Sequence, residues 1–572
     1  MSIFSTSHLR SRGDATIQSL KVCTAMRASY WILSLLLSAS TWLLAGTYYI
    51  DFAAGNDSSD GTSPSTAWRR CPGDPSATGN AQAKSLRAGD LVIFKGGVVY
   101  VGTIKIVTSG TATAPIIFDG NDSDSWGFGR AIIDRTHLSG ARCFTGNANV
   151  SHIVIRGFEL RNCGGYRDDD PILSTTTPIT SPPDGVGVDF FAGGHKNLRF
   201  ENLYLHRIGQ WRNQIPFSGG NSITGTGISL QNCDGVLIRN CEFTKMRNPI
   251  AIKSIALTKN IEVDRCDLHD YFVWGVDIAP RKTGAAFSDI WIHDTIIRDY
   301  HQYDSGNWLG YGEKPHTDGI FLRTSGISSG WTNINVFNCS FYTDYPGNSI
   351  GGTASIYVSQ GPSVNIYNNV FNRDKHTRVI GIIGNVATTN PQFIRIYNNS
   401  FLNGPTQVYI AGESNTSRRA IHIRNNIFYR TGQANYTMIN YESGTFPNSL
   451  DYNIYFDPAV SASKRYVFMY AGNYRTLSSI QNSGYEPNGR YLDPGYLDII
   501  PTLPSADDLR LTVGANALAR GINLSTVFQI DKASLPRVAT GPWDVGAYTG
   551  EATSISTLDP NPPVNLRLVS RE

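Results

Sequence analysis

The chain has 572 residues, of which 17% are charged, and its formal net charge is only +3. This balance, with no basic run and no nucleic-acid motif, argues against a nucleic acid as the partner. The 56 glycines and 28 tyrosines are typical of a turn-rich all-β chain. Repeat proteins grow without splitting into domains, so one long repeat domain is the simplest organisation for this length.

Residues 1–45 are predicted to be a leader. Arg27 precedes an apolar run at Trp31–Leu37, and small residues follow as far as Ala45. This is the outline of a secretory signal peptide, and the run is short for a membrane span. An uncleaved membrane anchor is the alternative. We expect a secreted or periplasmic protein with no stable membrane span once the signal is cleaved.

Residues 46–135 are predicted to form an N-terminal cap and the first strands. Apolar and polar residues alternate at 86–95, 102–106, 114–119 and 131–134. A period of two is the pattern of a strand that buries one face. Strands are therefore expected well before the repeat that follows.

Residues 136–457 contain a repeated sequence of apolar and polar alternation followed by an Asn-rich turn. The clearest copies start at 334, 364, 394 and 421, at steps of 30, 30 and 27 residues, and weaker copies start at 153, 198, 236, 261, 290 and 450. Each copy needs a neighbouring copy to cover its buried face, and the repeated Asn side chains are expected to hydrogen-bond along the stack. The repeat predicts a right-handed, single-stranded parallel β-helix of about ten coils with N- and C-terminal caps.

Three coils are longer than the repeat because they carry insertions at 166–184, 211–226 and 301–317. Each insertion follows the second strand of its coil, so the three loops are expected to wall one groove. The alternative is that they are decoration without function. Their aromatic and charged side chains, together with Trp274 from a neighbouring strand, are the candidate substrate-binding residues: Trp211, Arg212, Trp308, Tyr311 and Lys314.

The third strand of each coil is expected to border this groove. When these strands are aligned at a Gly or Pro, their apolar residues fall on alternate positions, which are expected to point inward. The polar residues at the positions between them, or in the preceding turn, are expected to face outward: Lys253, Asp277, His316, Asp318 and Arg323. Neighbouring strands lie about 4.8 Å apart. Lys253 and Arg323 are therefore expected roughly 10 Å apart, with Asp277 between them.

These residues suit the cleavage of an acidic polysaccharide by β-elimination. The reaction needs a group that neutralises the uronate carboxylate, a base for the C5 proton and an acid for the leaving oxygen. Lys253 is the candidate base, provided that its surroundings depress its pKa, and His316 or Arg323 is the candidate acid or stabiliser. Asp277 and Asp318 are candidate Ca²⁺ ligands, because calcium prefers oxygen. The plainer interpretation of Lys253 is a solvated surface lysine.

The opening strands resemble those of secreted parallel β-helix polysaccharide lyases. Lys253-Ser254 at the end of one third strand, and Arg281 after the next, resemble the catalytic Lys and Arg of polysaccharide lyase family 6, the alginate and chondroitin lyases. The sequence departs from that family at two places: Ala279-Pro280-Arg281-Lys282 stands where an Arg-His pair is expected, and Met246-Arg247-Asn248 lacks the acidic metal ligands expected ahead of the lysine. The resemblance implies a polysaccharide lyase with Lys253 and Arg281 as catalytic residues.

Two other functions stay open. His316-Thr-Asp-Gly319 resembles the Asn-Thr-Asp-Gly sequence of polygalacturonase-type β-helix hydrolases, in which case Asp277 and Asp318 would be an acid and base pair. The third possibility is a non-catalytic glycan-binding protein that uses Trp274 and the aromatic residues of the insertions as stacking platforms.

The repeat stops near Asp457. Residues 458–550 are predicted to form a C-terminal capping region, because the exposed end of a repeat stack has to be covered. Residues 551–572 are expected to be a tail. We expect the folded protein to be a monomer.

Three cysteines, Cys241, Cys266 and Cys339, occupy one column of the repeat. Buried, stacked thiols are the favoured interpretation of this column. A disulfide between Cys241 and Cys266 is the alternative.

Overall fold

The structure, a computed structural model, divides the chain into two units, Met1–Gly46 and Thr47–Glu572, and the second unit carries the β-fold. The described residues are 45–136, 141–164, 185–209, 225–271, 273–300, 317–324, 330–343, 353–359, 363–383, 392–411, 419–432, 437–442, 449–461, 465–499 and 505–550. Within these ranges, no helix has the length and apolar character that a membrane crossing requires.

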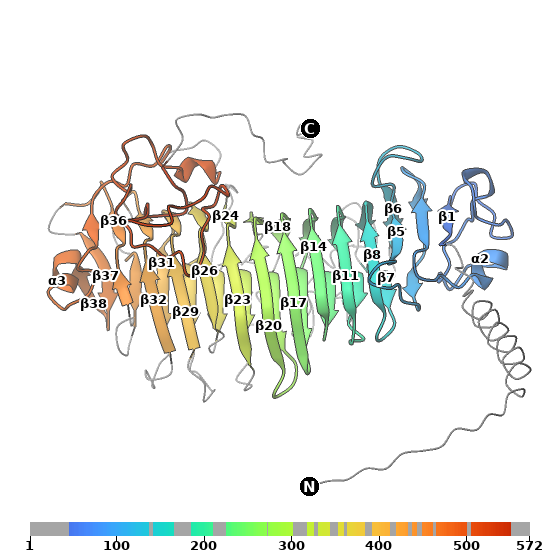
Figure 1. Cartoon of the computed structure of the whole chain (residues 1–572), viewed down its shortest axis with the longest axis horizontal. Helices are drawn as coiled ribbons and strands as arrows, with labels where there is room; N and C mark the ends of the chain where they lie inside the picture. The colour runs from blue at the N-terminus through green and yellow to red at the C-terminus, as the bar shows by residue number, and fades with distance from the viewer. Residues whose placement is uncertain are drawn as a thin grey trace, which may run out of the picture. The chain divides into compact units, whose positions relative to one another are not determined.

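Three sheets of thirteen strands make up the fold, and Figure 1 shows their strands side by side from β1 to β38. Sheet 1 contains β1 (Thr47–Ile50), β2 (Leu91–Phe94), β5 (Ile116–Asp119), β8 (Ser151–Arg156), β11 (Lys196–Glu201), β14 (Asp234–Arg239), β17 (Leu257–Asp264), β20 (Ala286–His293), β23 (Trp331–Phe337), β26 (Val364–Tyr367), β29 (Gln392–Tyr397), β32 (Arg419–Arg424) and β35 (Ser449–Asp451). Sheet 2 contains β3 (Val99–Tyr100), β6 (Ala131–Asp134), β9 (Phe158–Arg161), β12 (Tyr204–Ile208), β15 (Glu242–Met246), β18 (Asp267–Tyr271), β21 (Ile296–Arg298), β24 (Ser340–Tyr342), β27 (Val370–Asn372), β30 (Ser400–Leu402), β33 (Ile427–Tyr429), β36 (Ile454–Phe456) and β39 (Arg490–Tyr491). Sheet 3 contains β4 (Ile104–Ile106), β7 (Ala141–Gly146), β10 (Gly185–Phe190), β13 (Thr226–Gln231), β16 (Asn248–Ser254), β19 (Trp274–Pro280), β22 (Asp318–Arg323), β25 (Ala354–Ser359), β28 (Arg378–Ile383), β31 (Thr406–Ala411), β34 (Ile439–Tyr441), β37 (Tyr466–Tyr470) and β38 (Asn473–Thr476).

The chain passes from sheet 1 to sheet 2 to sheet 3 in each coil, as in β8, β9 and β10, and then returns to sheet 1. Pairing between coils is parallel, except that β37 and β38 are antiparallel. This arrangement confirms the predicted parallel β-helix. The coils begin earlier than the visible repeat, because β2 to β7 already belong to the three sheets.

Columns of identical positions fill the interior, because the parallel register places each repeat residue on its equivalent in the next coil. In sheet 1, Ile334, Val364, Ile394 and Ile421 are register partners and at most 2% exposed. The Phe residues of the repeat form a second column in sheet 2, with ring centroids 4.8 to 5.3 Å apart: Phe341, Phe371, Phe401, Phe428 and Tyr455. The repeat thus encodes the core directly.

The second Asn of each repeat turn forms a buried ladder, as the sequence predicted. The side-chain amides of Asn369, Asn399 and Asn426 each donate to the side-chain oxygen of the next coil's Asn at 3.0 Å, and Asn453 is the last of them. The ladder ends on a buried carboxyl group, because Asn453 donates to Glu486 at 2.6 Å. Every rung satisfies backbone groups that would otherwise be buried without partners.

Replacing Asn399 by alanine is expected to lower the free energy of unfolding by about 3 kcal/mol. The substitution removes the acceptor of the Asn369 amide and the donor to the Ile366 carbonyl, both of which are buried. Urea denaturation measures the change. The matched control is Asn365→Ala, because the half-buried amide of Asn365 bonds only along the outer face. Equal losses for the two variants would contradict a special role for the ladder.

The C-terminal region has two parts. The β37–β38 hairpin and α3 (Leu477–Gln481) follow the last coils, whereas the segment 505–550 lies along several coils, as the red ribbon in Figure 1 shows. There it meets the first Asn of successive repeat turns: the Asn368, Asn398 and Asn425 amides donate to backbone carbonyls of this segment at 2.7 to 3.1 Å. The segment therefore covers a long corner of the stack, which is more than the end cap expected from the sequence. The short elements outside the sheets are α2 (Gly79–Ala83) and the 3₁₀ helices η1 (Pro64–Thr66) and η4 (Asp507–Leu509).

The three predicted insertions share one exit from the coil. They lie between β9 and β10, between β12 and β13, and between β21 and β22, so each connects sheet 2 to sheet 3. Most of their residues lie outside the described ranges. The common exit point at the edge of sheet 3 is the one that the sequence predicted.

Candidate active site

The candidate site lies on the outer face of sheet 3, where β16, β19 and β22 are neighbours. Alternate residues of these strands point inward and are fully buried: Ile250, Ile252, Val276, Ile278, Ile320 and Leu322. The residues between them therefore face outward. Lys253, Asp277 and Arg323 come from these outward positions, one from each strand, as the sequence predicted.

Lys253 and Arg323 share the carboxylate of Asp277. The Lys253 ammonium donates to Asp277 Oδ2, and Arg323 Nε lies 3.8 Å from Asp277 Oδ1. The Asp277 side chain is 2% exposed, that of Lys253 12% and that of Arg323 33%. The two cations thus border the protein surface above a buried anion.

The surroundings of Lys253 favour its neutral amine. Burial is the largest influence and lowers the pKa of the Lys253 ammonium, and the positive charges of Arg323 and Arg247 lower it further. The Asp277 carboxylate acts in the opposite direction, yet the pKa stays below the ordinary lysine value. A lysine with a lowered pKa loses its proton at a lower pH than an ordinary lysine, so it is better suited to accept a proton from a substrate.

Trp274 holds two guanidinium groups beside Lys253. Its ring lies 5.0 Å from the guanidinium carbon of Arg323 and 5.3 Å from that of Arg247. Arg247 precedes β16 and Arg323 ends β22, so the two arginines reach β19 from the strands on either side of it. Phe321 packs against the same ring at 5.2 Å. Sequence reasoning did not assign a role to Arg247, because it occupies a turn position with no alternation to mark it.

Two other predicted residues are placed elsewhere on the sheet. Arg281 donates its backbone N–H to Ser254 at 2.7 Å, and its guanidinium lies 5.0 Å from the ring of Phe191, which follows β10. It therefore faces the coils that precede Lys253. Asp318 is fully buried, and its Oδ1 accepts the backbone N–H of Ala354 at 3.0 Å.

Asp277 and Asp318 do not meet. Asp277 pairs in register with Phe321, whereas Asp318 pairs with Trp274, three positions back along β19. The two backbone positions are thus about 11 Å apart. Because Asp277 is already paired with two cations, these two carboxylates do not form the calcium site that we expected.

The remaining predicted residues lie outside the described residues. These are His316 among the candidate catalytic groups, and Trp211, Arg212, Trp308, Tyr311 and Lys314 among the candidate substrate-binding groups.

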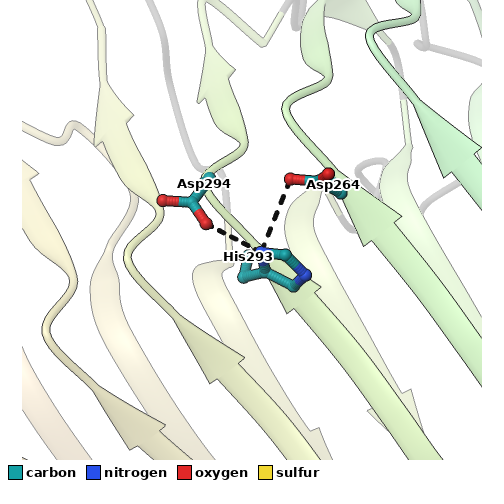
Figure 2. Close-up of side chains that lie close together, drawn as sticks. All are labelled: Asp264, His293 and Asp294. Atoms are coloured by element: carbon teal, nitrogen blue, oxygen red, sulfur yellow. Dashed lines mark hydrogen bonds and ion pairs between the residues drawn. The ribbon is translucent and has the colours of Figure 1, made fainter. Parts of the chain in front are cut away.

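A second cluster, on sheet 1, brings together the side chains of Asp264, His293 and Asp294 (Figure 2). One potential metal-binding atom from each lies within 4.8 Å of the other two, and the described residues contain no other such group. His293 Nδ1 lies 2.7 Å from Asp294 Oδ2 and 3.5 Å from Asp264 Oδ1. The donor set of two carboxylates and an imidazole suits a divalent cation in principle.

Arginines already neutralise this cluster, however. Arg239 and Arg265 contact the buried Asp264 carboxylate at 2.6 and 2.9 Å. Burial lowers the pKa of His293, but the hydrogen bond to Asp294 and the surrounding carboxylates raise it more, so its pKa lies above the ordinary value. A metal requires neutral imidazole. The cluster therefore fits an ion-pair network better than a metal site.

The thiols also follow the favoured sequence interpretation, because all seven cysteines in the described ranges are free and buried.

No family model and no curated protein matches the chain. Similarity was found only to solved structures. A structure of pectate lyase Pel9A aligns at 16% identity over 88% of this chain and 97% of that chain, with a TM-score of 0.43. A GH136 lacto-N-biosidase from Eubacterium ramulus aligns at 12% identity over 69% and 65%, with a TM-score of 0.47. A PL6 family alginate lyase, AlyGC, aligns at 12% identity over 71% and 55%, with a TM-score of 0.35. Polysaccharide lyases, the class that the sequence resembles, are thus among the similar structures, and the chemistry has to be argued from this chain's own side chains.

Proposed function

We propose that the protein is a carbohydrate-active enzyme that cleaves an acidic polysaccharide by β-elimination at the outer face of sheet 3. The observation that carries the proposal is Lys253, a largely buried lysine of lowered pKa that stands between a carboxylate and two arginines. A solvated surface lysine would have neither this burial nor these neighbours. The leader predicted in the sequence would deliver such an enzyme to polymers outside the cytoplasm.

Each part of the reaction has a candidate group. Arg323 and Arg247 bind the uronate carboxylate, and their charge makes the C5 proton more acidic. The neutral amine of Lys253 removes that proton, the electron pair forms the C4–C5 double bond, and the C4–O bond breaks. His316 is the candidate group for protonating the leaving oxygen, whereas Arg281 faces the coils that precede Lys253. Asp277 orients Lys253 through their hydrogen bond.

A hydrolase is supported less well. In glycoside hydrolases two carboxyl groups flank the scissile bond, whereas Asp277 is paired with Lys253 and Asp318 is fully buried and accepts a backbone N–H. A non-catalytic glycan-binding protein has no need of a lysine with a lowered pKa, so the site favours the lyase over this alternative too.

The direct test offers the purified chain a panel of uronate polymers, including alginate, pectate and glycosaminoglycans. A lyase produces an unsaturated uronate, which is detected by its ultraviolet absorbance. New reducing ends without this absorbance would show a hydrolase instead. Binding without any product would show a glycan-binding protein.

Replacing Trp274 by leucine is expected to raise KM for the polymer about tenfold and to change kcat less. The reason is that the indole ring fixes Arg247 and Arg323, each by a cation–π contact of about 1 to 2 kcal/mol. Steady-state kinetics measures both constants. Trp291→Leu on sheet 1 is the control and should behave as the wild type. A loss confined to kcat would contradict a role in holding the carboxylate-binding groups.

A further inference from the structure

Two buried cysteines lie side by side where one coil meets the next. Cys143 is part of β7, and Cys163 follows β9 of the next coil, just before the insertion at 166–184. Both are fully buried, and their sulphur atoms are 2.7 Å apart.

Cys241 and Cys266 also interact with each other, but the Cys143–Cys163 contact is set apart by its short distance. The remaining buried cysteines place their sulphur atoms 3.2 to 3.7 Å from backbone carbonyls, which they contact as weak donors: Cys71, Cys233, Cys241, Cys266 and Cys339. Cys143 and Cys163 instead approach each other more closely than any of these thiols approaches a carbonyl. Two sulphur atoms at this separation need only a small movement to reach the bond length of a disulfide.

The backbone provides room for this pair. Cys143 lies between Arg142 and Phe144 on β7, and its equivalent in the next coil is Gly187, which has no side chain. The Cys143 side chain can therefore extend toward Cys163 without a competing neighbour from β10.

We propose that Cys143 and Cys163 form a disulfide when the chain folds in contact with a disulfide oxidant. The two thiols lose two hydrogens to the oxidant, whose own disulfide is reduced to two thiols, and one sulphur–sulphur bond joins the coils. Burial and the neighbouring Cys163 raise the pKa of the Cys143 thiol in the folded protein, so little thiolate is left to react there. The disulfide therefore forms during folding, before the two thiols are buried. It fastens the coil of β7 to the base of the first insertion.

The test maps the bond in the full chain, and its result is independent of any enzymatic activity. The reduced, denatured chain is refolded with reduced and oxidised glutathione, free thiols are alkylated under denaturing conditions, and unreduced peptides are identified by mass spectrometry. The expected result is one linked peptide pair that carries Cys143 and Cys163, while Cys241 and Cys266 are alkylated. Alkylation of both Cys143 and Cys163, or linkage of either to another cysteine, would overturn the proposal.

A second measurement compares thermal unfolding of the refolded chain with and without reductant. Reduction is expected to lower Tm by a few degrees, because it frees the closed loop in the unfolded state. The double variant Cys143→Ala with Cys163→Ala should show no such difference. A wild-type Tm that does not respond to reduction would count against the bond.

Discussion

Replacing Lys253 by methionine is expected to lower kcat about a thousandfold on the polymer that the wild type cleaves, because the substitution removes the base and keeps the length of the side chain. Because the substitution leaves the buried Asp277 carboxylate without its closest cation, a loss of stability accompanies it, and folding is measured beside activity. Circular dichroism measures whether the variant folds, and the ultraviolet product assay measures its kcat. The matched control is Lys259→Met, which removes a partly exposed, ion-paired lysine from sheet 1. Full activity in the Lys253 variant would remove the base from the proposal.

The pH dependence of the same reaction provides a finer test. Activity should rise with pH as the Lys253 ammonium loses its proton, and this rise should lie below the pH range of an ordinary lysine. Replacing Arg323 by glutamine removes a charge that lowers the Lys253 pKa, so the rise should move to higher pH. Replacing Asp277 by asparagine removes the carboxylate that raises it, so the rise should move to lower pH. Shifts in the opposite directions would show that another group controls the rate.

The fold could be predicted from the sequence wherever one coil repeats the next. Ile334 and Val364 recur at one register position, so periodicity alone places them in one column. The coils of β2 to β7 and the segment 505–550 lack the repeat. Their places depend on long-range contacts, such as the Asn398 amide with the Asp544 carbonyl, which no local pattern encodes.

The site was partly predictable for the same reason. Strand alternation sent Lys253, Asp277 and Arg323 to one face, and the parallel register then brought them together. Asp277 is the register partner of Phe321, and Asp318 lies three positions before Phe321 on the same strand. Alternation could not show this offset, because the register between coils depends on where each strand begins. Nor could it single out Arg247, whose position beside Trp274 follows from side-chain packing.

Glu486 closes the Asn ladder with a carboxyl group that is fully buried. Its Oε1 accepts hydrogen bonds from the Asn453 amide and the Tyr455 hydroxyl. Burial raises the pKa of Glu486 to about 8, and the nearby charge of Asp451 adds to this, although the hydrogen bonds from Asn453 and Tyr455 lower it. The group is therefore protonated in the folded protein over a pH range in which it is ionised in the unfolded chain.

This difference makes stability fall as the pH rises. Below about pH 4.5 Glu486 is protonated in both the folded and the unfolded chain, and its contribution to the free energy of unfolding is fully present. Between about pH 4.5 and 8 this contribution is lost at on the order of 1 kcal/mol per pH unit, and above pH 8 the loss is complete. Glu486→Gln keeps the shape and removes the ionisation, so this variant should be the more stable one at pH 8 and should lose most of the pH dependence. Urea denaturation from pH 5 to 9 measures the effect, with Glu201→Gln, an exchange at an ion pair of the outer face, as the control. A pH dependence that is equal in wild type and Glu486→Gln would mean that the ladder ends on a carboxylate, and that Asn453 and Tyr455 stabilise its charge enough to offset burial.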